Sequence, residues 1–195
     1  MVVHPSFPAK TVPEFIVYAK AHPGRISMAS AGVGAESHVS GELFKAMAGV
    51  DMVHVPYRSL AEGLTDLIGG RVQVSFSTMP PAIEFVKAGT LRALAVTSAT
   101  RAQALPDLPT IGEFLPGYEA TLLTGLGAPR NTPAEIVAKL NKEINAILAN
   151  PEIKTRLAEL GSVPLPMTPA EFRTLMVEET EKWGKVVKFS GAKAE

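Results

Sequence analysis

Residues 26–47, with the sequence ISMASAGVGAESHVSGELFKAM, constrain the fold of this chain more than any other stretch. Residues 26–29 are a short apolar run that predicts a buried strand, and a loop of small residues follows, with glycines at positions 32 and 34. After this loop, apolar residues recur at helical spacing, namely Val39, Leu43, Phe44 and Met47. A strand, a glycine loop and a helix in this order direct free backbone N–H groups and the positive end of a helix toward an anion. The stretch predicts an anion site, and a tight turn without a ligand is the alternative.

The rest of the first 117 residues continues the alternation of short apolar runs with helical segments. Runs that predict strands occupy residues 2–4, 51–55, 72–76 and 91–96. This alternation predicts parallel βαβ units joined by right-handed crossovers. Residues 98–117 contain three prolines and no periodic pattern, which indicates a functional loop or a bridge between domains. We therefore expect an α/β domain over residues 1–117 and a second part over residues 118–195.

The second part is predicted to be mainly helical. Two TPAE tetrapeptides, at residues 132–135 and 168–171, have the pattern of a helix start, with a Thr cap, a Pro at the first helical position and a Glu three residues past the cap. Asn150 and Pro151 open a further helix between them. The last helix is expected to turn five residues inward, namely Phe172, Leu175, Met176, Trp183 and Val187.

Composition excludes several classes of function. Lysine plus arginine equals aspartate plus glutamate, 19 each, so the chain has no electrostatic footprint for nucleic acid or an anionic membrane. The absence of cysteine excludes disulfides, thiolate nucleophiles and cysteine metal sites. No apolar stretch reaches the roughly 18 residues of a membrane helix. The four histidines are not in metal-ligand spacing, so we expect no metal site.

The glycine loop also lacks the patterns of the common nucleotide sites and of nucleophilic catalysis. Ser37 stands where a dinucleotide fingerprint has its third glycine, and no acidic residue ends the next predicted strand. The phosphate-binding pattern GxxxxGK[ST] does not occur. Ser30 and His38 lack a GxSxG elbow and an acidic partner. We therefore expect no catalytic residue and no cofactor.

Polar residues follow the predicted strands at their carboxyl ends, where an open parallel sheet binds ligands. Tyr57 and Arg58 follow the second strand of the alternation, and Ser77 and Thr78 follow the third. Arg58 is equally well explained as a solvated surface charge. Hydroxyls and backbone amides without paired carboxylates bind polar anions well and catalyse little.

Six motifs together resemble the Bug/TctC family, the extracytoplasmic solute receptors of tripartite tricarboxylate transporters. They are ASAGVGAESH (29–38), GELFKAMAGVD (41–51), HVPYR (54–58), LRALAVT (91–97), RAQALPDLPT (101–110) and GAPRNTPAEIV (127–137). The resemblance runs along essentially the whole chain. It implies a type II periplasmic-binding-protein-like α/β fold whose two domains close on a small carboxylate, a periplasmic location and the membrane subunits of the transporter as partners.

By this resemblance the glycine loop would hold a ligand carboxylate through its backbone amides and the Ser30 hydroxyl. The implied ligand-binding residues are Ser30, Ala31, Gly32, Gly34, Ala35, His38, Tyr57, Ser77 and Thr78. Ala35 departs from the Ser or Thr usual in the family, which removes one hydroxyl. Ser77 stands where amino-acid-binding members carry an Asp, which favours a plain di- or tricarboxylate or an aromatic acid as ligand.

Family members begin with a signal peptide and opening βαβ units that have no counterpart in this sequence. The resemblance therefore implies that residues 1–117 are the second, ligand-binding domain. Residues 118–195 would be the returning strand and helices of an incomplete first domain. We expect a truncated product, a mis-assigned start or a deliberately shortened chain, with weak or absent ligand binding. The rival hypotheses are an α/β enzyme that binds a phosphorylated or nucleotide substrate at the glycine loop, and a remnant with no binding role.

Overall fold

A computed structural model describes residues 1–192, which form two compact units. The first unit consists of residues 1–122 together with the chain from Lys185 onward, and the second is Leu123–Gly184. The division into two family domains at residue 117 stays a prediction. No helix of the described residues is long and apolar enough to cross a membrane.

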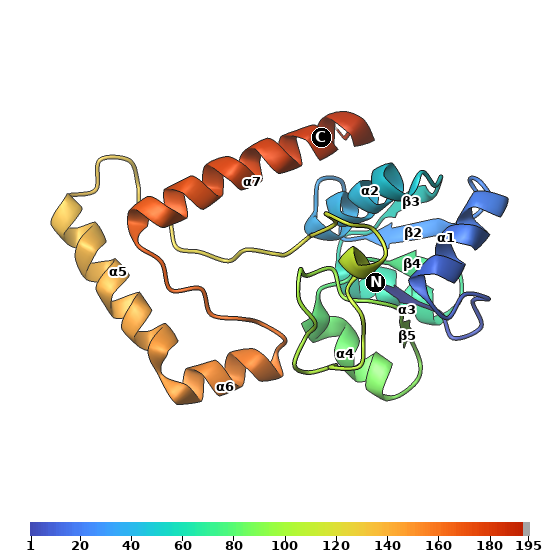
Figure 1. The fold of residues 1–195 in the computed structure, drawn as a ribbon, viewed down its shortest axis with the longest axis horizontal. Coiled ribbons are helices and arrows are strands. Elements are labelled where there is room, and N and C mark those ends of the chain that lie inside the picture. The colour runs from blue at the N-terminus through green and yellow to red at the C-terminus, as the bar shows by residue number, and fades with distance from the viewer. Residues whose placement is uncertain (193–195) are drawn as a thin grey trace. The chain divides into compact units, whose positions relative to one another are not determined.

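A five-stranded sheet with the order β3-β2-β4-β1-β5 forms the centre of the first unit (Figure 1). Its strands are β1 (Val2–Val3), β2 (Ser27–Ser30), β3 (Val53–Pro56), β4 (Val74–Ser75) and β5 (Arg92–Ala93). The central strand β2 pairs in parallel with β3 and β4, which confirms the α/β class. The expectation of a wholly parallel sheet is wrong for β1, which runs antiparallel to β4 and β5. β1 lies between β4 and β5 and is not a neighbour of β2 in the sheet, so the local alternation of strands and helices does not specify its direction.

Four helices accompany this sheet, namely α1 (Val12–Ala21), α2 (Glu36–Ala48), α3 (Leu60–Ile68) and α4 (Met79–Lys87). Met28 and Ala29 are successive residues of β2 and point to opposite faces of the sheet. Met28 contacts α2 at Gly41, whereas Ala29 lies against α3 at Gly63. Both side chains are fully buried, so β2 is packed on both faces of the sheet where it leads into the loop before α2.

The core on the α2 side is aromatic. The rings of Phe15 and Phe44 lie 5.8 Å apart and those of Phe44 and Phe76 lie 5.3 Å apart. Tyr118 completes this cluster, and its hydroxyl donates to the carbonyl oxygen of Ser40 in α2 at 3.0 Å. The long connection is anchored to the same unit, because Val96 bridges to Thr110 and the fully buried Ile111 follows within a 3-10 helix (Ile111–Glu113).

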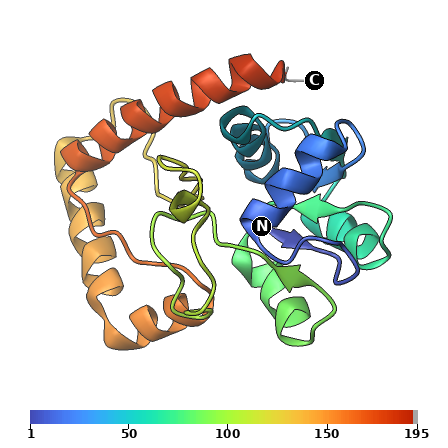
Figure 2. The same cartoon turned by 45° about the vertical axis from the view of Figure 1, so that its right-hand side comes forward.

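The second unit contains α5 (Ala134–Ala149), α6 (Pro151–Glu159) and most of α7 (Pro169–Ser190), which Figure 2 shows as successive helices. None of its residues is buried. The prediction that Met176 faces inward is therefore wrong, since it is 46% exposed, and it is also wrong for Val187, in the part of α7 that belongs to the first unit, which is 37% exposed. Trp183, in α7, is half-buried and its indole N–H donates to Glu179 at 2.7 Å.

The two TPAE tetrapeptides start their helices differently. At Thr168 the capping box is confirmed, because the hydroxyl accepts from the Glu171 amide at 3.2 Å and the Glu171 carboxylate accepts from the Thr168 amide at 2.8 Å. At Thr132 the prediction of a cap is wrong. The chain turns at Asn131, which has a φ of +70°, and the Thr132 hydroxyl donates backward to the carbonyl oxygen of Pro129. Pro133 occupies the cap position there.

Candidate functional site

The loop between β2 and α2 has the predicted strand–loop–helix geometry. It leaves β2 at Ser30 and reaches α2 at Glu36, with Ala35 as the residue that caps the helix. Gly32 has a φ of +118° and Gly34 a φ of +78°. Residues with a side chain rarely adopt these positive φ values, so glycine at both positions allows the backbone to make this tight turn.

Hydrogen bonds within the loop use most of the amides that the sequence indicated as ligand donors. The Ala31 amide donates to the Ser37 hydroxyl at 3.0 Å, and the Gly32 amide donates to the Ser30 hydroxyl at 3.1 Å. The Gly34 amide donates to Nδ1 of His38 at 3.0 Å, and the Ala35 amide donates to the Gly32 carbonyl oxygen at 3.2 Å.

Three other amides remain available for a ligand. The backbone N–H groups of Val33, Glu36 and Ser37 have no acceptor among residues 1–192. Glu36 and Ser37 are the first two helical residues of α2, whose amides have no partner within the helix and lie at its positive end. The rule for helix starts would have indicated these two donors from the sequence, whereas Val33 requires the loop geometry.

The Ser30 hydroxyl is buried and engaged by the protein itself. It lies 2.5 Å from Nε2 of His54 in β3 and 3.1 Å from the Gly32 carbonyl oxygen. The His54 ring stacks on the His38 ring, with centroids 3.7 Å apart and planes inclined by 15°. The sequence placed His54 in the HVPYR motif but gave it no role, because the contact joins residues on different elements.

The two stacked rings are held neutral by their surroundings. Burial, together with the proximity of two other basic groups, His38 and Lys45, lowers the pKa of His54 to about 4. Burial also lowers the pKa of His38, although the Glu42 carboxylate, 3.8 Å from its Nε2, acts in the opposite direction. At neutral pH both imidazoles are therefore uncharged hydrogen-bonding groups.

The strand ends bring further predicted residues to the same edge of the sheet. The Tyr57 amide donates to the Ser30 carbonyl oxygen at 3.0 Å, but its hydroxyl donates to Asp66 at 2.8 Å, in α3. Ser77 follows β4, whose Ser75 pairs with Ala29, and the Ser77 hydroxyl donates to the Thr78 carbonyl oxygen at 2.8 Å.

Thr78 caps α4 without using its side chain as the cap, so its hydroxyl is available. Arg58 is exposed, as its alternative interpretation as a surface charge allows.

The polar groups at the carboxyl ends of β2, β3 and β4 are backbone amides, hydroxyls and neutral imidazoles. The Glu36 side chain at the start of α2 is the one carboxylate among the loop residues 30–38, and it accepts from the Ser40 hydroxyl at 2.9 Å. Burial raises the pKa of this carboxyl group. Among residues 1–192 no group of three or more histidine or acidic side chains is arranged to hold a metal ion. The arrangement therefore suits the binding of an anion by uncharged donors.

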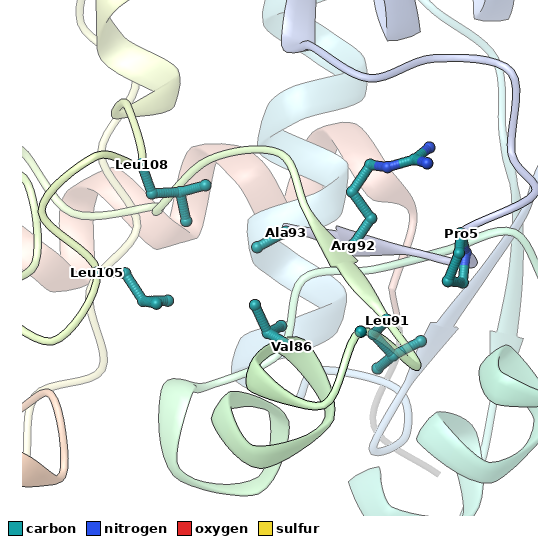
Figure 3. Close-up of a pocket in the computed structure, with 8 residues that line it drawn as sticks. Pro5, Val86, Leu91, Arg92, Ala93, Leu105 and Leu108 are labelled. Atoms are coloured by element: carbon teal, nitrogen blue, oxygen red, sulfur yellow. The ribbon is translucent and has the colours of Figure 1, made fainter.

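A surface pocket of about 370 Å³ lies elsewhere in the first unit, against β5. Its side chains are mainly aliphatic and include Val86, Leu105 and Leu108. Figure 3 shows the Arg92 guanidinium directed away from the two leucines, and one of its nitrogens donates to the Phe7 carbonyl oxygen at 3.2 Å. Arg92 is thus the one charged residue of this lining, and its guanidinium is engaged by the backbone.

Comparisons with known proteins identify what this chain is similar to. A family model described as "Tripartite tricarboxylate transporter family receptor" matches residues 1–192. A curated relative from Pseudomonas sp. (strain P51), the "UPF0065 protein in tcbD-tcbE intergenic region", is 36% identical over 180 residues, which are 91% of this chain and 54% of the relative.

Two solved structures have the same fold. That of R. palustris Rpa4515 with adipate is 38% identical with a TM-score of 0.88, and the match covers 98% of this chain and 64% of that one. That of MatC (Rpa3494) from Rhodopseudomonas palustris with bound malate is 33% identical with a TM-score of 0.80, and the match covers 95% and 65%. The chain thus spans between half and two thirds of the length of these proteins.

Proposed function

Because this chain belongs to the TctC family of tripartite tricarboxylate transporter receptors, we propose that it binds a small organic carboxylate at the β2–α2 loop. The proposal rests on three backbone N–H groups, those of Val33, Glu36 and Ser37, which have no acceptor within the described chain and lie in the loop and the first turn of α2. A carboxylate accepts two or three such bonds at a helix N-terminus. Adipate and malate in the two related structures are both small dicarboxylates, which supports this ligand class.

In this proposal the predicted residues divide into two roles. Gly32 and Gly34 shape the loop, and the Ser30 hydroxyl and His38 hold it, because their hydrogen bonds are made within the protein. The backbone of Ala31 and Ala35 belongs to the same support. Tyr57, Ser77 and Thr78 line the edge beside the loop, and among them the Thr78 hydroxyl is the available donor.

The receptor role extends to location and partners. We place the protein in the periplasm, where it would deliver its solute to the membrane subunits of a tripartite transporter, as the family membership supports. Residues 1–117 would form the ligand-binding domain, and residues 118–195 would belong to the other domain. The second unit supports this assignment, since its helices bury no residue by themselves.

Titration of the chain with adipate, malate and citrate, followed by the amide resonances of the loop, tests the proposed ligand class. The Val33, Glu36 and Ser37 amides are expected to shift downfield with a dissociation constant of about 1 mM or tighter, whereas adipamide, which has no charge, leaves them unchanged. Absence of a shift with every acid would refute the proposal. Shifts with a sugar phosphate or a nucleotide and none with the carboxylates would support the rival enzyme hypothesis.

An Ala35→Ser variant is expected to raise the free energy of unfolding by about 1 kcal/mol. Ala35 has the extended conformation of a helix cap, with φ −62° and ψ 156°, but no side-chain oxygen, and the Ser37 amide lacks an acceptor. A serine hydroxyl there would accept that amide. Urea unfolding without ligand measures the gain. Ala35→Val, which adds bulk without an oxygen, is the control and is expected to be no more stable than the parent.

A further inference from the structure

The stacked rings of His38 and His54 form hydrogen bonds with opposite ends of the glycine loop, residues 30–35. His54 contacts the Ser30 hydroxyl at 2.5 Å, where the loop leaves β2. His38 accepts the Gly34 amide at 3.0 Å, where the loop approaches α2. Because the rings stack with their centroids 3.7 Å apart, the two contacts are joined through van der Waals contact between the imidazoles.

The hydrogen bonds define the protonation of His38. Its Nδ1 accepts the Gly34 amide, so this nitrogen carries no proton and the neutral ring has its proton on Nε2, beside Glu42. A second proton on Nδ1 would remove the acceptor for the Gly34 amide.

The Ser30 hydroxyl has a single proton to donate. It accepts the Gly32 amide at 3.1 Å and has two possible acceptors, Nε2 of His54 at 2.5 Å and the Gly32 carbonyl oxygen at 3.1 Å. With neutral His54, the shorter contact is the hydrogen bond from Ser30 to Nε2, and this bond fixes the oxygen that receives the Gly32 amide.

We propose that His54 is a positioning residue of the carboxylate site. His54 forms a hydrogen bond with Ser30 and stacks on His38. These contacts hold the loop in the conformation in which the N–H groups of Val33, Glu36 and Ser37 are free to donate to the ligand. His54 does not itself contact the ligand. The effect on ligand binding rests on the proposed function, whereas the effect on the loop does not.

The stability of the loop conformation held by the two histidines depends on pH with a defined sign. Both histidines have a pKa below 6.5 in the folded chain, so the unfolded or opened loop takes up protons more readily. The closed loop is therefore weakened as the pH falls from about 6.5 toward 4. The titratable groups that act on these rings come from α2, namely Glu42 and Lys45, which bond to each other at 2.8 Å, and Glu42 partly offsets the loss by stabilising a charged His38.

Amide hydrogen exchange of the ligand-free chain tests the inference directly. In His54→Ala, protection at Gly32 and Gly34 is expected to fall about tenfold, while the core amides of Phe44 and Val74 keep their protection. His54→Gln, whose side-chain amide can still bond Ser30, is expected to restore most of the protection at Gly32. His22→Ala is the matched control, because His22 also stacks on an aromatic ring, that of Tyr18 at 4.2 Å, but is exposed and remote from the loop.

The same measurement between pH 7.5 and 4.5 separates positioning from simple packing. Protection at Gly34 is expected to fall with pH in the parent chain. It should stay flat in His38→Asn, whose side-chain oxygen can accept the Gly34 amide without titrating. Unchanged loop protection in His54→Ala, or an equal loss throughout the core, would overturn the inference.

Titration with adipate tests whether His54 also affects ligand binding. We expect His54→Ala to weaken binding about tenfold and His22→Ala to leave it unchanged. If the parent chain binds no carboxylate, the proposed function fails while the exchange experiment still decides the role of His54. If the parent binds and His54→Ala binds equally well, the inference fails and the proposed function stands.

Discussion

A Gly41→Ala variant is expected to lose about 2 kcal/mol of unfolding free energy, although alanine is the better helix former. A β-carbon at position 41 of α2 would lie 2.0 Å from Sδ and 2.7 Å from Cε of Met28, and 3.2 Å from the Phe76 ring. Met28 is the end of a flexible side chain, but it is fully buried between α2 and the sheet. Its sulfur can move only by displacing neighbouring core side chains, which is the cost of overpacking.

Gly184→Ala is the matched control, since it makes the same change in α7, where a β-carbon would meet nothing within 4 Å. It is expected to stabilise its helix by about 0.5–1 kcal/mol. Urea unfolding followed by circular dichroism compares the two variants. Adding Met28→Ala to Gly41→Ala should cost at least about 1 kcal/mol less than the sum of the single changes. Equal effects of the two glycine substitutions would show that α2 does not approach β2 this closely.

Gly32→Ala is expected to weaken carboxylate binding at least tenfold, about 1.4 kcal/mol. The reason is the backbone, because Gly32 has a φ of +118°, which an alanine strongly disfavours. Space is not the obstacle, since the nearest atom to the added carbon is the Tyr57 carbonyl oxygen at 3.6 Å. An alanine would rotate the loop to a negative φ and change the orientation of the next amide, that of Val33, which is one of the three proposed donors.

The control for this prediction is Gly70→Ala. Gly70 also has a positive φ, +72°, with open space around it, but it follows α3 and precedes β4, at the opposite edge of the sheet. It should lose about 1 kcal/mol of stability without any change in the dissociation constant for adipate. Calorimetric titration of both variants measures the difference. A Gly32→Ala protein that binds adipate as tightly as the parent would contradict the role of the loop.

The sequence predicted these helices and strands because each has a local signal. The apolar run and paired glycines of residues 26–34 are enough to indicate β2 and its loop, and Thr168 with Glu171 is enough to indicate a helix start. The family resemblance also predicted the receptor class. These features depend on residues within a few positions of each other.

Two features were not predicted because they depend on contacts between residues that are distant in the sequence. The direction of β1 depends on pairing with β4 and β5, more than 70 residues away in the sequence. The role of His54 depends on Ser30, in another strand. The prediction of a cap at Thr132 failed locally: the chain turns at Asn131, and the Thr132 hydroxyl donates to the Pro129 carbonyl oxygen, although the tetrapeptide is identical to that at Thr168.

Because the second unit contains no buried residue, tryptophan fluorescence would not measure the unfolding of the whole chain. Trp183, the only tryptophan of the chain, lies in that unit, beside Glu179 and Lys182 on one face of α7. Its emission therefore reports the local unfolding of α7. The aromatic residues of the sheet and its core are tyrosine and phenylalanine, which contribute little to that signal. Tryptophan fluorescence and far-ultraviolet circular dichroism should give different unfolding midpoints, and a two-state fit to the emission alone would understate the stability of the half that carries the glycine loop.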